Sequence, residues 1–381
     1  MAGPLDGVRV IELSGLGPGP FAAMVLADLG AEVIRVDRAR AVRGGNPAAP
    51  PADVLNRGRR SIGIDLKSPD GVEALLRLVD SADALIEGFR PGVCERLGLG
   101  PDVCLDRNPA LVYGRMTGWG QDGPWAGRAG HDINYIALSG TLSMIGRRGE
   151  GPVPPINLLG DFGGGGMLLA VGVLAGIVSA RTSGEGQVVD AAMIDGAALL
   201  ASMMYGLKAM GMWEGERGGN LLDTGAHFYD VYETADGKFI SLGAIEGHFY
   251  EEMLERLGFD DGDLADQFDA ARWDENRELI TGRVKEKTRD EWEEVFRDSD
   301  ACYAPVLEMD EAHEHPQLAA RKTFVEIAGV TQPAPAPRFD QTPTAIPAPP
   351  AHVGQHTDEV LADYGFSAAE ITALRDVEAI A

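Results

Sequence analysis

Residues 7–38, GVRVIELSGLGPGPFAAMVLADLGAEVIRVDR, decide the fold class of this chain. Within them, Val8–Leu13 has the apolar and β-branched character of a buried strand. Phe21–Leu29 is predicted to be a helix, because two prolines precede it and a glycine ends it. Glu32–Val36 then predicts a second strand. A strand, a helix and a strand in succession indicate a parallel sheet.

The alternation of strands and helices continues beyond this segment. Ser61–Leu66 predicts a third strand, and Asp70–Val79 predicts a helix with one apolar face. Ala84–Ile86 and Leu111–Arg115 predict two further strands. The fold class expected is therefore α/β, with a large domain built on a parallel sheet that helices cover on both faces.

The second half of the chain changes character. Met167–Val178 predicts a helix of small residues, and Ile194–Met212 predicts a long apolar helix. Phe228–Glu233 and Lys238–Leu242 flank Ala-Asp-Gly, which is a strong hairpin signal. Ser367–Val377 predicts a last helix that begins with a capping box. The domains expected are a large one over 1–190, a long helix and linker over 191–226, a smaller acidic α+β domain over 227–325, and a linker with a C-terminal return to the large domain over 326–381.

Charge is distributed unevenly along the 381 residues. The whole chain holds 33 basic and 59 acidic residues, a formal net charge of −26. Residues 1–130, however, hold 15 basic and 16 acidic residues. The overall acid excess argues against a general nucleic-acid or anionic-membrane binder. The nearly neutral first third is where we expect an anionic ligand.

Cysteine usage and the N-terminal segment indicate a cytoplasmic location. The chain has three cysteines and no Cys-x-x-Cys pair, so neither a disulfide framework nor a zinc site is expected. The first ten residues lack the basic and apolar regions of a signal peptide. The most apolar stretch, Gly163–Ala180, is rich in glycine and is not expected to span a membrane.

The turn after the first strand imitates a dinucleotide-binding fingerprint. Gly15, Gly17 and Gly19 follow that strand, and Asp37 ends the second strand about 20 residues later. Pro20 stands where the pattern needs its third glycine, and the prolines of this turn lack the N–H groups that would hold a pyrophosphate. We therefore interpret the segment as a strand-to-helix turn, and a dehydrogenase is the least favoured function.

Cationic side chains follow the predicted strands. Arg38, Lys67 and Arg90 lie at or just beyond the carboxyl ends of strands, and Arg96 lies nearby. That edge of an open α/β sheet binds ligands, and arginine matches the geometry of phosphate. Each cation taken singly is as easily a solvated surface charge, but together they indicate a phosphorylated ligand. The segment before the third strand adds a basic surface loop with the option of ordering over a ligand; its arginines are Arg40, Arg43, Arg57, Arg59 and Arg60.

Three further residues carry acid–base chemistry, and each has a plain structural alternative. His131 stands in Gly-His-Asp-Ile-Asn-Tyr at the start of a predicted helix, where it is either a neutral base or a structural residue. Asp161 precedes an apolar helix and is either its N-cap or a ligand-facing group. The glycines at 163–166 favour a ligand, because they leave bare backbone for a bulky group. Glu246 follows the hairpin and is either simply exposed or orients the histidine.

In combination these segments resemble the α-methylacyl-CoA racemases of the family III CoA-transferase superfamily. The resemblance covers nearly the whole chain, through residues 7–38, IDLKSPDG, IEGFRPGVCERLGLG, RMTGWGQDGP, GHDINYIALSG, PPINLLGDFGGGGM, GQVVDAAMIDG, GGNLLDTGAHFYDVYE and GAIEGHFYEEML. The first of these, together with GHDINY and GDFGGG, is specific in combination. The resemblance implies an interlocked homodimer with a Rossmann-like large domain and a smaller domain.

The resemblance also implies roles for single residues. His131 and Asp161 are implied as the two catalytic bases, and Glu246 as the residue that orients the histidine across subunits. Neither a metal nor a separate cofactor is implied, because CoA is part of the thioester substrate. The residues implied to contact CoA are Arg38, Ile64, Asp65, Leu66, Lys67, Gly88, Phe89, Arg90, Arg96, Gly130, Asp132, Ile133, Asn134 and Tyr135.

The reaction that the resemblance implies is interconversion of the (2R) and (2S) epimers of a 2-methylacyl-CoA thioester through an enolate. Burial against Phe162 is expected to raise the pKa of Asp161, so that this carboxyl can hold a proton near neutral pH. Two alternatives stay open: a CoA transferase in which Asp161 is the nucleophile, and a non-catalytic acyl-CoA-binding protein. The presence of His131 favours the racemase. An acyl-CoA thioester is the expected partner, and neither nucleic acid nor a membrane is expected.

Overall fold

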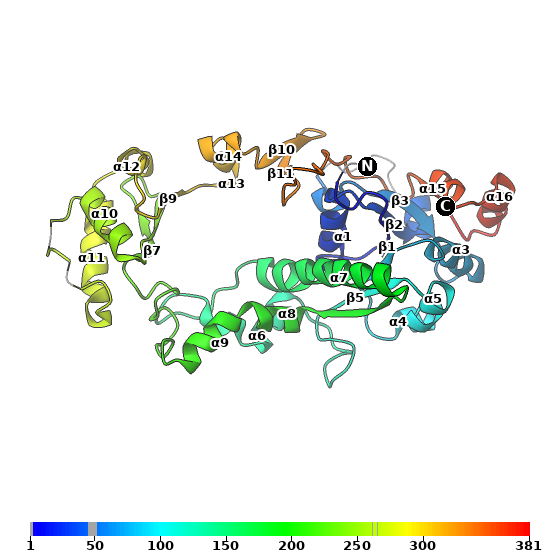
Figure 1. Cartoon of the computed structure of the whole chain (residues 1–381), viewed down its shortest axis with the longest axis horizontal. Coiled ribbons are helices and arrows are strands. Elements are labelled where there is room, and N and C mark those ends of the chain that lie inside the picture. The colour runs from blue at the N-terminus through cyan, green and yellow to red at the C-terminus, as the bar shows by residue number, and fades with distance from the viewer. Residues whose placement is uncertain (1–2, 45–51, 261, 265) are drawn as a thin grey trace. The chain divides into compact units, whose positions relative to one another are not determined.

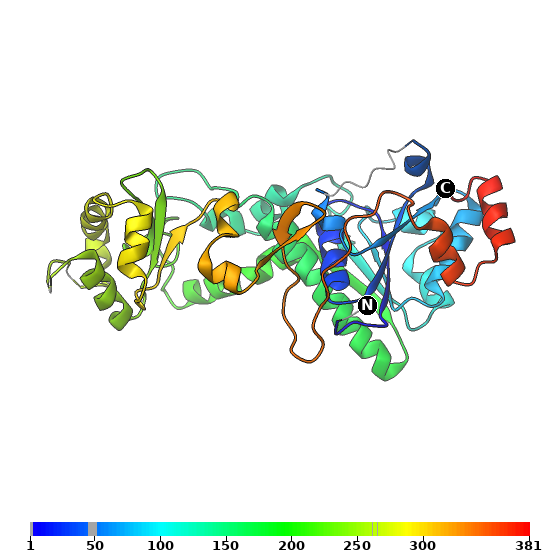
Figure 2. The same cartoon turned by 90° about the horizontal axis from the view of Figure 1, so that it is seen from above.

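The computed structural model describes residues 3–44, 52–260, 262–264 and 266–381. The chain forms two compact units, which Figure 1 and Figure 2 show in two orientations. The first unit comprises Met1–Ser139, Ile156–Leu200 and Lys322–Ala381, and the second comprises Gly140–Pro155 and Ala201–Arg321. The chain therefore leaves the first unit twice and returns to it at Lys322.

A six-stranded sheet forms the centre of the first unit, and all its neighbouring strands pair in parallel. Its strands are β1 (Arg9–Leu13), β2 (Glu32–Arg38), β3 (Arg60–Ile64), β4 (Ala84–Glu87), β5 (Val112–Thr117) and β6 (Gln187–Ala192). Their order is β3-β2-β1-β4-β5-β6, so Ile11 of β1 lies between Ile34 and Leu85. The α/β sheet expected from the sequence is confirmed. The order reverses between β1 and β4, and such a reversal opens a crevice at the carboxyl ends of the strands.

Two apolar layers cover the opposite faces of this sheet, because successive strand residues point to opposite sides. Val10 of β1 belongs to a layer with α1 (Pro18–Asp28) and α7 (Leu168–Ser183). Its neighbour Ile11 belongs to the other layer. The helices of that second layer are α3 (Pro69–Val79), α5 (Pro101–Arg107), α15 (Thr357–Asp363) and α16 (Ala368–Asp376). Figure 2 shows α1 on one side of the strands and the two C-terminal helices on the other.

The prediction of one long helix over Ile194–Met212 is wrong, because the structure has two helices in this stretch. Helix α8 (Met193–Leu200) ends before Ala201, and α9 (Ser202–Ala209) begins after it. This break coincides with the point where the chain passes from the first unit to the second.

The remaining elements are α2 (Ala39–Gly44), α4 (Val93–Arg96), α6 (Asp132–Leu138), α13 (Met309–Ala312), α14 (Pro316–Ala320), β10 (Phe324–Ile327), β11 (Val330–Pro333), a π-helix (Leu158–Met167) and 3-10 turns at Val54–Asn56, Thr141–Met144 and Ala270–Arg272.

One helical stretch combines unusual length with apolar composition. Among the described residues, Leu158–Ser183 is the helical segment that is long and apolar enough to cross a membrane. Its residues Leu169 and Val173 are buried and approach Gly114 of β5 closely. The contacts of the stretch are therefore those of a core helix that packs against the parallel sheet.

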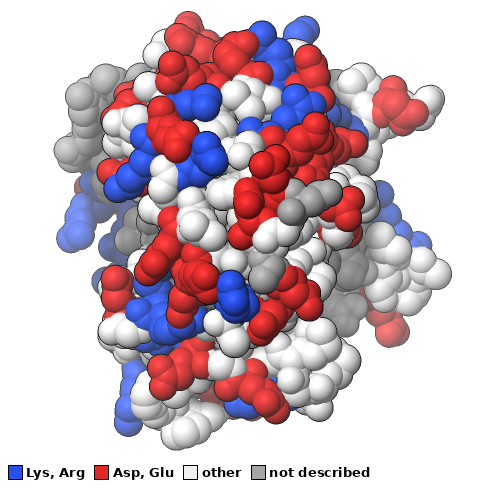
Figure 3. All heavy atoms as spheres, turned by 90° about the vertical axis from the view of Figure 1, so that its left-hand side faces the viewer, with Lys and Arg blue, Asp and Glu red and all other residues white. Residues whose placement is uncertain are grey.

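The second unit contains an antiparallel sheet with the order β7-β8-β9. Its strands are β7 (Tyr229–Glu233), β8 (Phe239–Gly243) and β9 (Tyr303–Val306), and its main helices are α10 (Gly247–Leu257), α11 (Trp273–Val284) and α12 (Arg289–Phe296). The pairing of β7 with β8 confirms the predicted hairpin. Phe228, Trp273 and Trp292 are central to the core of this unit. Figure 3 shows many carboxylates on one of its outer faces, with basic side chains among them.

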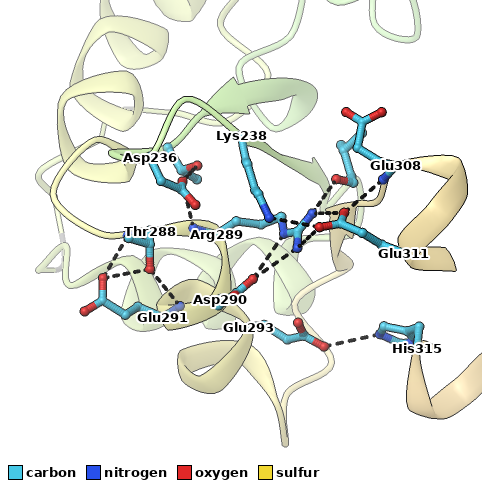
Figure 4. A network of polar contacts seen from close by, with 12 residues as sticks. Asp236, Lys238, Thr288, Arg289, Asp290, Glu291, Glu293, Glu308, Glu311 and His315 are labelled. Atoms are coloured by element: carbon cyan, nitrogen blue, oxygen red, sulfur yellow. Dashed lines mark hydrogen bonds and ion pairs between the residues drawn. The ribbon is translucent and has the colours of Figure 1, made fainter.

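A buried arginine ties the sheet of the second unit to the segment that follows β9 (Figure 4). Arg289 contacts both carboxylate oxygens of Glu311, at 2.6 and 3.1 Å. Lys238, which lies in the turn before β8, donates to the same carboxylate at 2.9 Å. The hydrogen bonds from Arg289 and Lys238 hold the pKa of Glu311 well below its ordinary value. The carboxylate therefore stays charged across the physiological range, and the network holds the chain in place after β9.

Two of the arginines expected in a basic surface loop before β3, Arg57 and Arg59, are buried and structural, so the expectation is wrong for them, whereas Arg40 is exposed. Arg59 is 3% exposed and forms an ion pair with Glu12 of β1. Arg57 is 2% exposed and pairs with Asp28 at 2.6 Å. Buried guanidinium groups need internal counter-charges, and here they have them. Residues 45–51 of this loop lie outside the described residues.

Arg59→Ala is expected to lower the free energy of unfolding by about 3–5 kcal/mol, because it leaves the buried Glu12 carboxylate without its counter-charge. Arg107→Ala is the matched control. Its partners, Asp80 and Glu73, are surface carboxylates, so the expected loss is about 0.2–1 kcal/mol. Urea denaturation of both variants beside the parent chain gives the two values. Equal losses for the two variants would contradict the role of the buried pair.

Candidate active site

A cavity of about 360 Å³ lies at the carboxyl ends of β1, β4 and β5, where the strand order reverses. His131 and Asp161 both line it, although they come from separate segments of the sequence. The other walls are formed by Gly15–Pro20 after β1, Gly88–Pro91 after β4, Met116–Trp119 at the end of β5, and Ala126, Arg128, Gly130 and Tyr135. All of these residues belong to the first unit. The volume falls within the range of about 300–1,000 Å³ that is usual for small-molecule sites.

His131 stands at the position that caps the N-terminus of α6. Its backbone is extended, and its N–H donates to Oδ1 of Asn134 at 3.0 Å. The side chain is exposed toward the cavity. The start of a short helix thus fixes the backbone that carries the imidazole, as the sequence predicted.

Tyr135 holds the loop that leads to His131. Its hydroxyl donates to the carbonyl oxygen of Gly130, and its ring packs edge-on against Trp119 with centroids 4.7 Å apart. A Cβ on Gly118 would lie 2.1 Å from this ring, so only glycine leaves room for it. The aromatic contact therefore joins the end of β5 to the start of α6.

Asp161 lies within the π-helix Leu158–Met167, so the interpretation of this residue as an N-cap is wrong. π-helical segments are rare in proteins, and those that occur often lie at functional sites. The Asp161 carboxyl is partly buried, and its Oδ2 accepts a hydrogen bond from Nδ2 of Asn157 at 3.1 Å. Burial is the main cause that raises the pKa of Asp161; the Asn157 hydrogen bond opposes this, while the charge of Asp132 adds to it. The expected direction of the shift is confirmed.

The glycines that follow Asp161 contact protein rather than open space, so the expectation that they leave backbone for a ligand is wrong. A Cβ on Gly164 would lie 2.6 Å from the backbone nitrogen of Ala197 in α8. A Cβ on Gly166 would lie 2.7 Å from the ring of Phe21 in α1. The absence of side chains lets the π-helix pack directly on its two neighbouring helices. Phe162 likewise packs on the Phe21 ring, with centroids 4.8 Å apart.

The turn after β1 takes part in the site, as the glycines of this turn led us to expect from the sequence. A Cβ on Gly17 would lie 3.2 Å from Oδ2 of Asp161, and Gly17 has a φ of 68° that side chains rarely adopt. The turn therefore presents bare backbone to the carboxyl. The turn follows the strand beside which the strand order reverses, and that is where open α/β sheets bind ligands.

The four predicted cations lie where the sequence placed them. Arg38, Lys67, Arg90 and Arg96 are exposed, and none forms an ion pair with a carboxylate within the described part of the chain. Arg90 also lines the cavity. These groups follow the carboxyl ends of β2, β3 and β4, so the strand ends carry unneutralised positive charge.

The predicted segment Ile64–Lys67 divides into two parts. Ile64 is 1% exposed and belongs to the core, and its backbone forms a bridge with Ile380. Asp65 and Leu66 are half-buried, and Lys67 is exposed. The exposed end of this segment is therefore the part that is accessible to a ligand.

Comparison with known proteins agrees with the fold. The profile of CoA-transferase family III matches residues 5–357. The chain belongs to CoA-transferase family III. It is similar to α-methylacyl-CoA racemase of Mus musculus, with 47% identity over 373 residues that cover 97% of this chain and 96% of the mouse protein. It is also similar to α-methylacyl-CoA racemase of Homo sapiens, with 46% identity over 373 residues, or 96% and 95% of the two chains. A solved CAIB/BAIF family protein from Brucella suis shares the fold, with a TM-score of 0.81, 24% identity, and coverage of 96% of this chain and 100% of that one.

Glu246, the third predicted catalytic residue, belongs to the second compact unit. Glu246 immediately precedes α10 and is exposed, whereas His131 and Asp161 belong to the first unit. It is not a lining residue of the cavity described above.

Two other residues near the cavity were not singled out from the sequence. Asn157 precedes Asp161 by four positions, and this helical spacing was a usable signal. Arg128 lines the cavity and lies over the ring of Trp125 at 4.5 Å. Within the described residues, no group of three His, Cys, Asp or Glu side chains is arranged to hold a metal ion.

Asn157→Ala is expected to raise the pKa of Asp161 further, because it removes a hydrogen bond that favours the ionised carboxylate. A group with a raised pKa is ionised only at higher pH. Carbon NMR of aspartate-labelled protein, read at the Asp161 resonance between pH 3 and 8, measures this midpoint. An unchanged or lower midpoint in the variant would contradict the assignment of the Asn157 hydrogen bond. Resonances of distant aspartates in the same spectra provide the control.

Proposed function

We propose that this protein is an α-methylacyl-CoA racemase, which interconverts the (2R) and (2S) epimers of 2-methylacyl-CoA thioesters. One observation carries the proposal: His131 and Asp161 line a single cavity at the switch point of the sheet. A 1,1-proton transfer needs two acid/base groups that face one site, and the His131 imidazole and the Asp161 carboxyl, whose pKa burial raises, are such groups. The 47% identity to the mouse racemase supports the same reaction.

The proposed mechanism uses the two groups in turn. Starting from the S epimer, His131 removes the α-proton, and the electron pair of the C–H bond moves into the thioester to form an enolate. Protonated Asp161 then gives its proton to the opposite face of the α-carbon. Starting from the R epimer, Asp161 removes the proton and His131 returns one. Burial raises the pKa of Asp161, which favours the protonated form that the first direction uses.

The start of α6 supplies a donor for the enolate oxygen in this mechanism. Asp132 is the first residue of the helix, where backbone N–H groups have no acceptor within the helix. An N–H that points at a developing oxyanion contributes about 3 kcal/mol to the transition state. We assign this role to the N–H of Asp132, next to the proposed base at His131.

The cations at the strand ends suit the phosphates of CoA. Arg38, Lys67, Arg90 and Arg96 carry unpaired charge there within the described chain, and each charge-assisted hydrogen bond contributes about 1.5–3 kcal/mol. The cavity takes the thioester end, while the nucleotide lies along the strand ends outside it. In this assignment CoA enters as part of the substrate, and no separate cofactor takes part.

We further propose that the protein is an interlocked homodimer in the cytoplasm. Large apolar side chains are exposed on α8, on α9 and just beyond α9, and exposed apolar side chains of this kind are typical of a protein–protein interface. Examples are Leu199 at 59%, Met203 at 60% and Met210 at 65% exposure. In such a dimer Glu246 orients His131 across subunits. The free cysteines Cys94 and Cys104 are compatible with a reducing compartment.

A CoA transferase is the second candidate, because the family as a whole carries that name. There the Asp161 carboxylate attacks the thioester carbonyl, forms a mixed anhydride and releases CoA thiolate. A free carboxylate then displaces the first acid from Asp161 to form a new anhydride, and CoA thiolate attacks that anhydride to give the new thioester and the free Asp161 carboxylate. Racemisation of a 2-methylacyl-CoA in buffer without any acceptor acid identifies the racemase, whereas turnover that requires an acceptor acid identifies the transferase.

His131→Ala and Asp161→Ala are each expected to slow racemisation by at least ~10²-fold, because each removes one proton-transfer group. His313→Ala is the matched control, since His313 is an exposed histidine of the second unit. Chiral chromatography of the acyl product measures the rates. Racemisation at the parent rate by either site variant would exclude the proposed pair.

Arg90→Ala is expected to weaken CoA binding about tenfold, which corresponds to ~1.4 kcal/mol for one lost phosphate contact. The parent protein is also expected to bind CoA less tightly as salt increases. Arg181→Ala, an exposed arginine at the end of α7, serves as the control and should leave the affinity unchanged. Isothermal titration with CoA gives the affinities. Equal affinities for all three proteins would show that Arg90 does not contact the phosphates.

A further inference from the structure

The side chain of Asp132 joins the two segments that carry the proposed bases. Asp132 follows His131 directly and is 5% exposed. Its Oδ1 accepts the backbone N–H of Asp161 at 2.6 Å. The residue next to one base thus holds the backbone of the other base.

The neighbouring glycine makes this contact possible. A Cβ on Gly160 would lie 2.5 Å from Oδ1 and 2.9 Å from Cγ of Asp132. Any other residue at position 160 would therefore displace the Asp132 carboxylate from the π-helix. The contact depends on both residues and is a built feature of the site.

The hydrogen bond also satisfies a backbone donor that the π-helix leaves unpaired. Asp161 lies in the first turn of that helix, where the N–H groups have no acceptor within the helix. A carboxylate is a strong acceptor for such a donor, and its charge suits the N-terminal end of a helix. The Asp161 N–H is therefore paired with α6 rather than with its own helix.

The second oxygen of Asp132 has no such partner. Oδ2 is buried and accepts no hydrogen bond from the described residues. A buried and incompletely paired carboxylate is costly to keep, so its presence beside Asp161 calls for a compensating role. The groups that face the Asp161 carboxyl are His131, Asp132 and Tyr135 on α6, Asn157 on the preceding segment, and the Gly17 backbone.

We propose that the Asp132 side chain is a positioning residue, which holds Asp161 in register with His131 across the α-carbon of the substrate. This inference rests on the proposed racemase function. The negative charge of Asp132 has a second effect, because it disfavours ionisation of Asp161 and so helps this carboxyl keep its proton. This role of the side chain is separate from that of the Asp132 backbone N–H.

Asp132→Asn and Asp132→Ala test the two effects. The asparagine variant keeps an oxygen that accepts the Asp161 N–H but loses the charge. We expect its acid limb of kcat/KM for the R epimer to move to lower pH, because Asp161 then ionises more easily. The alanine variant loses the acceptor, and we expect kcat to fall by about 10²-fold in both directions with little change in KM, since a displaced base costs rate rather than affinity.

An unshifted pH profile in Asp132→Asn together with an unchanged kcat in Asp132→Ala would overturn the proposal. If the alanine variant fails to fold, Gly160→Ala decides the positioning role, because its Cβ displaces the same carboxylate, and a kcat at the parent value in that variant would overturn the proposal. Carbon NMR titration of Asp161 in Asp132→Asn is the readout that does not depend on activity: a lowered Asp161 midpoint supports the charge effect, and an unchanged one excludes it. Absence of racemisation by the parent protein would instead overturn the proposed function.

Discussion

The close packing of the glycine-rich π-helix against α1 and α8 is the constraint on which the rest of the site depends. Gly164 and Gly166 approach Ala197 and Phe21 at distances that no side chain would permit. Because this helix lies directly against its neighbours, the Asp161 carboxyl faces the turn after β1 at Gly17. The parallel sheet then brings the ends of β4 and β5, and with them the loop before His131, to the same cavity.

Charged side chains have different surroundings in the two units. The strand ends of the first unit carry cations without partners in the described chain, while its buried arginines, such as Arg57 and Arg59, are neutralised by carboxylates. Residues 246–314 carry 23 acidic and 8 basic residues, and part of this charge serves internal contacts such as that of Glu311 with Arg289. The net charge of the whole chain therefore does not exclude an anionic ligand, because the distribution of charge favours such a ligand in the first third of the chain.

The sheet, its strand ends and the cap at His131 were predictable because they rest on short-range patterns: apolar runs, helix starts and turn residues. The π-helix around Asp161 was not predictable from the sequence. Its hydrogen bonds span one residue more than those of an α-helix, and this leaves no recognisable period in the sequence. The burial of Arg57 and Arg59 was also missed, because composition assigns arginine to the surface and the partners, Asp28 and Glu12, are distant in sequence. The glycines at 163–166 were recognised as unusual, but only the structure shows that helices rather than a ligand fill the space beside them.

The central claim is that two different groups, His131 and Asp161, exchange protons with the α-carbon from opposite faces. The most direct measurement starts from one pure epimer of a 2-methylacyl-CoA in deuterium oxide and follows the α-position of the newly formed epimer by NMR during the first turnovers. The account predicts that the new epimer carries deuterium from the outset, because its proton comes from a second group that has equilibrated with solvent. A new epimer that retains the original α-proton would mean that a single group carries the proton between the two faces, and would contradict the account.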